Sequence, residues 1–389
     1  MRNLNLYIFI LSSVLFMSCN TSSNWNEAGE AVLKDLIVSN AAWAMEQELE
    51  TVTAHLCDRS AGGIHDFYSE GDYWWPNPEG EDKAYIRRDG ETNPNNFVAH
   101  RHSMIRFSKI VGSLATAYVT TGDEKFVEHA FKHINAWFVN ADTKMNPNLQ
   151  YAQAIKGITT GRGIGIIDTI HFMEVAQGIL MMQHADNVDK EVLAKAKDWF
   201  KQYIVWLRTH PNGLDEMNTK NNHATCWAMQ VASFAKLVED KETLDFCRER
   251  YKNILLPNQM ADNGSFPLEL ERTKPYGYAL FNLDAMVTLV QILSTEDDNL
   301  WEYKTEKGLS IRDGIQFMYP FIKDKGTWTY AKDVMYWDEW PVAQPALYFG
   351  AVAYNESSYF DLWKSLKHTS QVDEVIRNLP IRNVLLWTK

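Results

Sequence analysis

Two short segments of the chain carry side chains that can transfer protons and hold an anion. Lys220-Asn221-Asn222-His223 stands just before the apolar run Ala224–Val238. Further along, Arg272 is followed by Tyr276 and Tyr278, ahead of a second apolar run. A helix N-cap would explain the Asn pair, and a surface loop with a Glu271–Arg272 ion pair would explain the second segment. Taken together, the two segments offer amide and imidazole donors, a guanidinium and phenols.

This set of groups suits β-elimination from a 4-linked uronic-acid polymer. The C5 proton of such a sugar is weakly acidic because the neighbouring carboxylate is already negative. Asn222 and His223 are suitable donors to that carboxylate, and Arg272 can bind it through two parallel hydrogen bonds. Tyr278 can take the proton and return one to O4. A phenol has a pKa of about 10, and a nearby Arg lowers a pKa by roughly 1–3 units.

Other side chains are candidates for binding a sugar chain. Trp74 and Trp75 can stack on sugar rings or pack in the core. Arg162 lies between two glycines, which allow a close approach of the backbone. A basic strip across the cleft is expected from Arg101, Arg162, Lys220 and Arg272. Asn221 and Tyr276 are further substrate-binding candidates, and Tyr276 is also the second candidate for the proton carrier.

The composition limits the partners. The net charge of −12 argues against binding to nucleic acid through bulk electrostatics, so an anionic polysaccharide requires a locally basic cleft. The 14 Trp residues are more than a plain core needs and favour a sugar-binding cleft. No metal-ligand spacing is present, so no metal and no cofactor are predicted. The sequence leaves the oligomeric state open.

The N-terminus has the features of an export signal. Arg2 precedes a short apolar run, Leu6–Met17, which ends at Ser18-Cys19. This pattern resembles a bacterial lipoprotein signal, with residues 1–19 as the signal peptide and Cys19 as the lipidated residue. Residues 20–25 then form a short tether. We therefore expect a periplasmic or outer-membrane lipoprotein that meets a membrane only through its lipid anchor.

The elements that must position these residues are helices. Apolar side chains recur with helical spacing along most of the chain. The predicted helices are Ala28–Glu50, His102–Thr121, Glu124–Val139, Gly165–Gln183, Lys190–Thr209, His223–Val238, Lys241–Ile254, Phe281–Leu293, Ile311–Ile322, Val342–Tyr354 and Tyr359–Lys367. Pro275 and Gly277 are expected to keep the segment before Phe281 irregular.

Many of these helices form hairpins with short polar joints. Such hairpins can close into an all-α (α/α) toroid, or incomplete α/α barrel, with a central cleft. Four long segments between the predicted helices are rich in Trp, Arg, Asn and Tyr and are expected to line the cleft: Gly71–Asn96, Asn140–Arg162, Pro211–Asn222 and Gly264–Gly277. Residues 26–389 are expected to form a single domain.

At these residues the sequence resembles the alginate-lyase family of polysaccharide lyases. Five blocks carry the resemblance, in order: Gly71-Asp72-Tyr73-Trp74-Trp75-Pro76-Asn77-Pro78, Tyr85-Ile86-Arg87-Arg88-Asp89-Gly90, Gly161-Arg162-Gly163 with Asp168, Asn221-Asn222-His223, and Arg272…Tyr278 with Phe281-Asn282-Leu283. The resemblance implies an (α/α) toroid, neutralisation of the substrate carboxylate by Asn222, His223 and Arg272, and proton transfer by Tyr278.

The resemblance also implies a choice of substrate. In mannuronate-type and glucuronate-type sugars the C5 proton and O4 share a face, so a single Tyr can act as base and acid. The opposite C5 configuration needs a base on the other face, a role open to His223. Two alternatives remain at this stage. A glycoside hydrolase would draw its carboxylate pair from Asp215, Glu216, Glu269 and Glu271, and a non-catalytic glycan-binding lipoprotein would bind without turnover.

Overall fold

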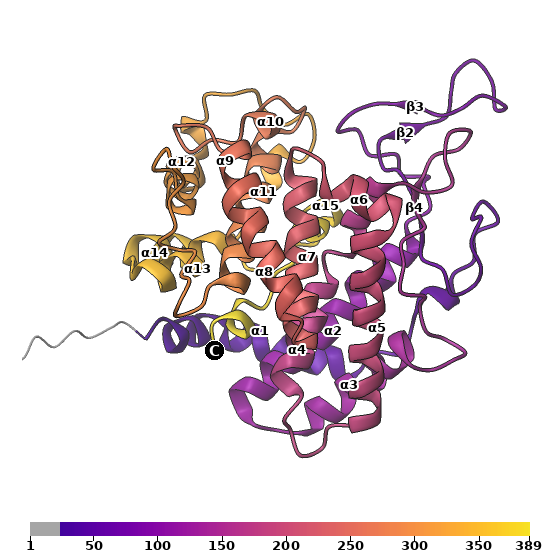
Figure 1. The fold of residues 1–389 in the computed structure, drawn as a ribbon, viewed down its shortest axis with the longest axis horizontal. Helices are drawn as coiled ribbons and strands as arrows, with labels where there is room; N and C mark the ends of the chain where they lie inside the picture. Colours follow the sequence, from indigo (N-terminus) through magenta and orange to yellow (C-terminus); the bar gives the residue numbers. More distant parts are fainter. Residues whose placement is uncertain (1–23) are drawn as a thin grey trace, which may run out of the picture.

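Helices make up most of the chain in the computed structural model, which describes residues 24–389 (Figure 1). The α-helices are α1 Trp25–Met45, α2 Ala99–Thr121, α3 Lys125–Phe138, α4 Phe172–Met182, α5 Lys190–Thr209, α6 Pro211–Met217, α7 Asn222–Val238, α8 Lys241–Arg250, α9 Leu256–Gln259, α10 Pro267–Leu270, α11 Pro275–Leu293, α12 Ile311–Lys323, α13 Pro345–Tyr354, α14 Ser357–Ser365 and α15 Asp373–Arg377. Four short strands are β1 Tyr68–Glu70, β2 Trp74–Trp75, β3 Ile86–Arg87 and β4 Tyr151–Ala154.

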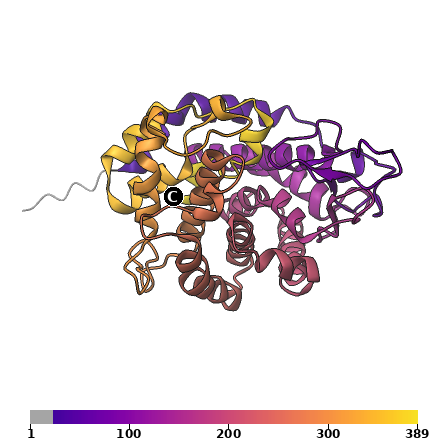
Figure 2. The same ribbon diagram turned by 90° about the horizontal axis from the view of Figure 1, so that it is seen from above.

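The long helices form two rows. α2, α4, α7, α11 and α13 pack against one another in sequence order and are buried on most sides. α3, α5, α8, α12 and α14 pack on their outer side and keep a solvent-exposed face. Figure 2 shows the helices following a curved path from the indigo N-terminal region to the yellow C-terminal region. The fold is the (α/α) toroid that the sequence predicts.

The first helix and the last hairpin close the ring. The Trp25 indole donates to Asn355 Oδ1 at 3.0 Å, and its ring lies 5.1 Å from that of Phe360. The C-terminal residues then cross the lower end in Figure 1, where Gln177 and Gln291 donate to the carbonyls of Leu386 and Trp387. These contacts tie both ends of the described chain to the inner helices.

Several predicted helix bounds differ from the observed ones. The Lys190–Thr209 prediction is confirmed as α5. The predicted helix over 165–183 is instead a 3-10 segment, Gly163–Thr169, followed by α4. The helix predicted over 241–254 ends at Arg250 and continues as a π-helical segment, Tyr251–Leu255. The predicted loop over 211–222 contains α6, which Pro211 begins at a position where its missing N–H costs nothing.

The helix that carries Tyr278 begins earlier than predicted. α11 starts at Pro275, so the expectation of an irregular segment up to Phe281 is wrong. Pro is well suited to the first helical position, where no intrahelical N–H bond is lost. The Asp333 carboxylate accepts from the N–H groups of Tyr276 and Gly277 at 2.8 and 2.9 Å, which satisfies two donors of the first turn. Tyr278 is therefore on a rigid element.

α11 is the most apolar long helix among the described residues. It is long and apolar enough to cross a membrane, but 83% of that stretch is buried inside the protein. It packs on α7, α12 and α13 and forms part of the core. Cys57, Cys226 and Cys247 are free thiols.

Candidate active site

A cavity of about 340 Å³ opens at the upper end of the ring in Figure 1. The N-termini of α7 and α11, the segment that carries β2 and β3, and α15 meet there. The residues that line it are Asp72, Tyr73, Trp74, Arg87, Gln153, Arg162, Ile164, Ile167, Thr219, Asn221, Asn222, His223, Arg272, Tyr278, Phe281, Arg377 and Asn378. The cavity thus brings together Asn222, His223, Arg272 and Tyr278, which lie far apart in the sequence.

The Tyr278 hydroxyl has two polar neighbours. The Tyr73 hydroxyl lies 2.7 Å away, and Arg272 donates through Nη2 at 3.1 Å. The Arg272 guanidinium also lies over the Tyr278 ring, 4.2 Å from its centroid, and Lys274 Nζ lies 5.4 Å from the same point. Two cations and a second phenol therefore surround the candidate proton carrier.

The environment of Tyr278 acts on its pKa in both directions. Burial raises this pKa well above its ordinary value and Tyr73 adds to the rise, while Lys274 and Arg272 oppose it. The net direction is upward because a phenolate loses its hydration when it is buried. The sequence indicated that Arg272 would lower the pKa of Tyr278. It did not show that the side chain is buried, and burial has the larger effect on this pKa. Tyr278 is accordingly a neutral phenol at neutral pH.

His223 is held by a buried carboxylate. Its Nδ1 lies 2.7 Å from Glu216 Oε1, and the Glu216 side chain is 0% exposed. Burial raises the pKa of Glu216, and His223 opposes that rise. When Nδ1–H donates to the carboxylate, Nε2 is the nitrogen left for a ligand in the cavity. Glu216 thus fixes the orientation of the ring.

Asn222 is the first residue of α7, and Glu269 of α10 holds it. The Asn222 backbone N–H donates to Glu269 Oε1 at 2.7 Å, and its Nδ2 donates to Oε2 at 2.6 Å. The carboxylate thereby caps the N-terminus of α7, where the side chain of Asn221 makes no capping bond. One N–H of the Asn222 amide remains for a ligand.

Arg272 is positioned by the segment that carries β2 and β3. Its Nη2 donates to Asp89 Oδ1 at 3.0 Å and its Nε to Oδ2 at 3.3 Å. Asp89 also accepts from Arg87 at 2.6 Å and from the Thr273 hydroxyl at 3.0 Å. Arg272 pairs with Asp89 and not with Glu271, so the surface-loop explanation of this segment does not hold. Asp89 links this segment to the N-terminus of α11.

Arg162 lies beside Trp74 of β2, with its guanidinium 5.9 Å from the centroid of that ring, and glycines flank it in the sequence. A Cβ at Gly161 would lie 2.0 Å from Gln150 O, and one at Gly163 would lie 2.6 Å from Asp215 Oδ2. Arg162 donates to the carbonyl and the side-chain oxygen of Gln153 at 3.1 and 2.9 Å. No carboxylate lies within ion-pair distance of Arg162 among residues 24–389, which suits a ligand for an anion.

Arg377 of α15 is a cavity residue that the sequence did not reveal. Its Nη2 lies 2.9 Å from Asp72 Oδ2, and its Nη1 lies 3.5 Å from Glu374. Glu374 also pairs with the buried Lys274 beside Tyr278. Tyr73 belongs to a block that the sequence identified, but nothing local indicated that its hydroxyl would reach Tyr278. These contacts join segments too distant in sequence for any local pattern to show.

Four of the predicted substrate-binding residues do not line this cavity. Arg101 is 5% exposed and is bound by Asp72 and Asp168, so it belongs to a buried ion network. Tyr276 is fully buried, and its hydroxyl donates to Phe321 O. Trp75 donates to Glu91 O, and the Arg88 guanidinium covers its ring. Lys220 is exposed and is not among the residues that line the cavity.

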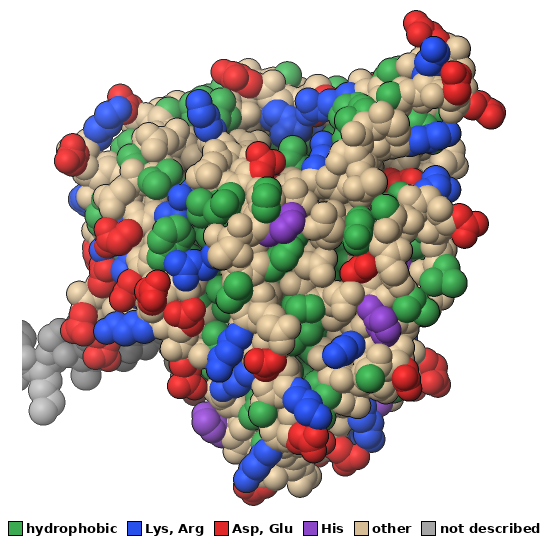
Figure 3. Space-filling model, turned by 45° about the vertical axis from the view of Figure 1, so that its right-hand side comes forward, with side chains coloured by type: hydrophobic (Ala, Val, Ile, Leu, Met, Phe, Trp, Pro, Cys, Tyr) green, Lys and Arg blue, Asp and Glu red, His purple; other side chains and the backbone are tan. Residues whose placement is uncertain are grey.

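The basic strip is therefore composed differently from the prediction. Arg87, Arg162, Arg272 and Arg377 line the cavity, whereas Arg101 and Lys220 do not. On the face drawn in Figure 3, acidic and basic side chains are interspersed, and Lys and Arg side chains gather near the upper edge. No group of three or more potential metal ligands is found within residues 24–389. The cavity is suited to binding a carboxylate and moving a proton beside it.

The chain resembles known proteins in sequence and in fold. Residues 51–328 match the sequence profile of the alginate lyase family. The structure is similar to that of an alginate lyase from Bacteroides ovatus, with a TM-score of 0.79 and 28% identity over 94% of this chain and 96% of that chain. It is also similar in fold to alginate lyase A1-III from Sphingomonas species A1, with a TM-score of 0.53 and 16% identity over 82% and 85% of the two chains. A variant of alginate lyase A1-III complexed with a tetrasaccharide gives a TM-score of 0.57 and 14% identity over 85% and 89%. The comparison with curated proteins gives no match.

Proposed function

The chain belongs to the alginate lyase family and is a polysaccharide lyase, and on that premise we propose that it cleaves a 4-linked uronic-acid polymer by syn β-elimination. The proposed substrate is a β-linked polymer of mannuronate-type or glucuronate-type units, such as polymannuronate or glucuronan. The meeting of Asn222, His223, Arg272 and Tyr278 in one cavity carries the proposal.

The first task is to neutralise the carboxylate at C5. Asn222 offers an amide N–H, and His223 offers Nε2–H in its doubly protonated form, while Glu269 and Glu216 hold the two side chains in place. Arg272 assists them, while Asp89 keeps its guanidinium oriented. Donors fixed before the reaction stabilise the charge that develops on the carboxylate as the C5 proton leaves.

The second task is the proton transfer, which we assign to Tyr278. As phenolate it takes the C5 proton, the electron pair forms the C4–C5 double bond, and the C4–O4 bond breaks. The leaving O4 then takes the proton from the Tyr278 hydroxyl. One polymer chain thus becomes two, and the new non-reducing end carries a 4,5-unsaturated uronate.

The phenolate is the demanding form, because burial raises the pKa of Tyr278. Arg272 and Lys274 are the two cations close enough to stabilise it. The phenol is the resting form, and it has the protonation state that the second half of the reaction needs. We therefore expect the rate of elimination to depend on the fraction of Tyr278 that is ionised, and so on its pKa.

The geometry also bears on the hydrolase alternative. Glu216 and Glu269, which could have formed a hydrolytic pair, are bound to His223 and Asn222 instead. Both are buried, and their role in the proposed reaction is to position these donors. In the proposed elimination, Glu216 and Glu269 position other side chains and do not react themselves.

A panel of polymers tests the proposal. Wild-type protein is mixed with polymannuronate, polyguluronate, glucuronan, hyaluronan, heparosan and pectate, and ultraviolet absorbance of the unsaturated product is followed. Absorbance should rise with polymannuronate or glucuronan. A strong preference for polyguluronate would overturn the syn assignment, since its C5 proton lies on the opposite face. New reducing ends without absorbance would indicate hydrolysis.

A further inference from the structure

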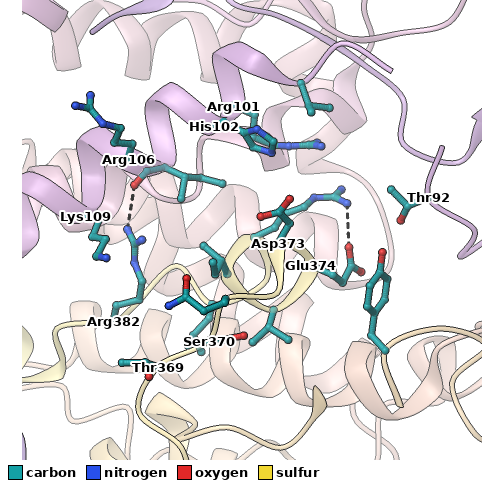
Figure 4. Close-up of a pocket in the computed structure, with 18 of the residues that line it drawn as sticks. Thr92, Arg101, His102, Arg106, Lys109, Thr369, Ser370, Asp373, Glu374 and Arg382 are labelled. Carbon is teal, nitrogen blue, oxygen red and sulfur yellow. Dashed lines mark hydrogen bonds and ion pairs between the residues drawn. The ribbon is translucent and has the colours of Figure 1, made fainter. Parts of the chain in front are cut away.

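A second and larger cavity, of about 790 Å³, lies beside the candidate active site. Asp72 and Arg377 line both cavities. The other walls of the second cavity come from α1, α2 and the C-terminal residues 368–383 (Figure 4). Its volume falls in the range of about 300–1,000 Å³ that is typical of small-molecule sites.

Lys and Arg outnumber Asp and Glu in the walls of this cavity, although the chain has a net charge of −12. Five Lys and Arg residues line it against three Asp and Glu residues. Two of those three acids, Asp72 and Glu374, are already paired with buried cations. The third, Asp373, is exposed. Four of the five cations also have a carboxylate within ion-pair distance: Arg101 and Arg377 pair with Asp72, Arg382 with Glu174 and Arg106 with Glu50. The charge left for a ligand is therefore that of Lys109.

Lys109 is the cation that an anion in this cavity would meet, and Arg382, which pairs with the buried Glu174 at 3.5 Å, lies beside it. Lys109 is half-buried and lies over the Trp43 ring, 4.1 Å from its centroid, with no carboxylate within ion-pair distance among the described residues. Burial and the neighbouring Arg382 lower the pKa of Lys109. Figure 4 shows Lys109, Arg382 and Arg106 on one side of the cavity. An anion there would relieve the repulsion between these cations.

Unpartnered polar atoms lie in the same walls. Ser113 Oγ, Thr92 Oγ1 and His368 Nε2 are buried and have no hydrogen-bond partner within residues 24–389. Ser113 is 3% exposed. Buried polar groups in folded proteins are nearly always hydrogen-bonded. Hydroxyls and an imidazole, together with Lys109, suit a ligand that carries both hydroxyl groups and an acidic group.

We propose that this cavity is a second binding site for a short 4-linked oligouronate, separate from the cavity that contains Tyr278. The carboxylate would lie at Lys109, and sugar hydroxyls would lie at Ser113 and Thr92. Leu36 and Ile105 supply apolar wall for the faces of the rings. The proposal rests on the proposed function for the identity of the ligand, since the enzyme itself produces such oligosaccharides.

Calorimetric titration tests this site. The parent is the full chain with Tyr278→Phe, so that the ligand is not cleaved, and the probes are saturated and unsaturated mannuronate trisaccharides. The parent should show two binding events. Lys109→Met keeps the apolar stem over Trp43 and removes the charge, so the second event should weaken at least about tenfold, as expected for a lost charged hydrogen bond. The two probes show whether substrate or product is preferred.

Two further variants make the result specific. Lys132→Met is the matched control, because Lys132 is exposed on α3 and pairs with Glu128, away from both cavities. It should bind like the parent. Ser113→Leu fills the cavity from α2 without a change in charge, and it should also abolish the second event. In the otherwise wild-type chain, Lys109→Met should leave the initial rate on a trisaccharide unchanged.

The outcomes separate this inference from the proposed function. A single binding event in the parent, equal binding by Lys109→Met, or equal binding of neutral mannotriose would overturn the second site. If wild-type protein still produces the unsaturated product, the proposed function stands. Conversely, binding that depends on Lys109, without cleavage of any uronan, would support the site and remove the proposed reaction.

Discussion

Opposing effects act on the pKa of Tyr278. Its hydroxyl contacts Tyr73 and Arg272, and burial raises its pKa while Arg272 and Lys274 oppose the rise. The same side chain must act first as a base and then as an acid in the proposed reaction. Its neighbours therefore set the balance between two protonation states.

Removal of the Tyr278 hydroxyl should stop turnover without loss of the fold. Tyr278→Phe keeps the ring and removes only the group that carries the proton. Loss of general acid–base catalysis costs roughly 10²–10⁴-fold, and because one group serves two steps we expect the upper end of that range. The measurement is kcat from product absorbance, with circular dichroism as the control for folding. Retention of more than about a tenth of the activity would exclude Tyr278 as the proton carrier, and His223 would be tested next.

The pH dependence should reflect the raised pKa of Tyr278. Below that pKa the phenolate fraction grows tenfold with each pH unit, so kcat/KM should rise toward alkaline pH. Arg272 opposes the rise in pKa, so Arg272→Gln should move the alkaline limb to higher pH as well as lower the rate. Rates measured from neutral to alkaline pH test both statements. A profile that falls as pH rises would show that the phenolate is not the reacting form.

At the level of elements, carboxylates from distant segments hold the helix ends that carry the site. Glu269 of α10 binds the first residue of α7, and Asp333 binds the first turn of α11. The N–H groups at a helix N-terminus have no intrahelical partner, so such contacts stabilise the helix end and fix its position. Asn222 and Tyr278 are thereby placed relative to each other by contacts outside their own helices.

Removal of the Glu269 carboxylate should affect both stability and turnover. Glu269→Ala leaves the Asn222 N–H and amide without their acceptor, and loss of a helix cap costs about 0.5–2 kcal/mol. The free energy of unfolding, measured with urea, should fall by that amount. Glu269→Gln is the control, because it restores one acceptor and should recover part of both quantities. If Glu269→Ala lowered stability and left kcat unchanged, Asn222 would not need this support for catalysis.

At the scale of the whole molecule, an acidic chain presents a basic cavity. The net charge is −12, yet four Arg residues line the candidate active site. A local cluster of this kind attracts an anionic polymer at short range, although the protein as a whole repels it. Binding therefore depends on the arrangement of charges in the ring and not on their sum.

Salt should weaken substrate binding. Exposed charges are screened beyond about 8 Å at physiological ionic strength, so KM for a uronan should increase with added NaCl while kcat changes less. Arg162→Met removes one of the cations of the cavity and should make this increase smaller. Steady-state rates over a series of salt concentrations provide the measurement. A KM that is independent of salt would contradict a basic cavity as the binding surface.

The N-terminal signal makes a prediction about location. Cys19 lies outside the described residues, so its lipidation stays a proposal from the sequence. Globomycin and Cys19→Ala should each change the processing of the chain in cells, and membrane fractionation should show the anchored form only for the wild type. Unchanged processing in both experiments would exclude a lipoprotein, although export by another route would still be possible.

The sequence by itself determined the fold class and the main chemical groups. Helical periodicity is a local property, so α5 and α7 could be predicted closely from their apolar spacing. The types of Asn222, His223, Arg272 and Tyr278 were sufficient to suggest their chemistry, because hydrogen-bonding capacity belongs to the side chain itself. The start of α11 was misplaced because Pro275 has two local interpretations, a helix breaker and a first helical residue.

Only the tertiary structure decided which groups act on one another. Arg101 has the same charge as Arg162, yet Asp72 and Asp168 enclose the first while the second lines the cavity. Glu216 and Glu269 bind His223 and Asn222 because the fold placed these residues against them, and the proposed reaction uses the two carboxylates only for positioning. Arg377 and Lys274 reach the site through contacts between distant segments. Burial and long-range pairing set the pKa of a group and its freedom to bind, and both arise only when the helices pack into the ring.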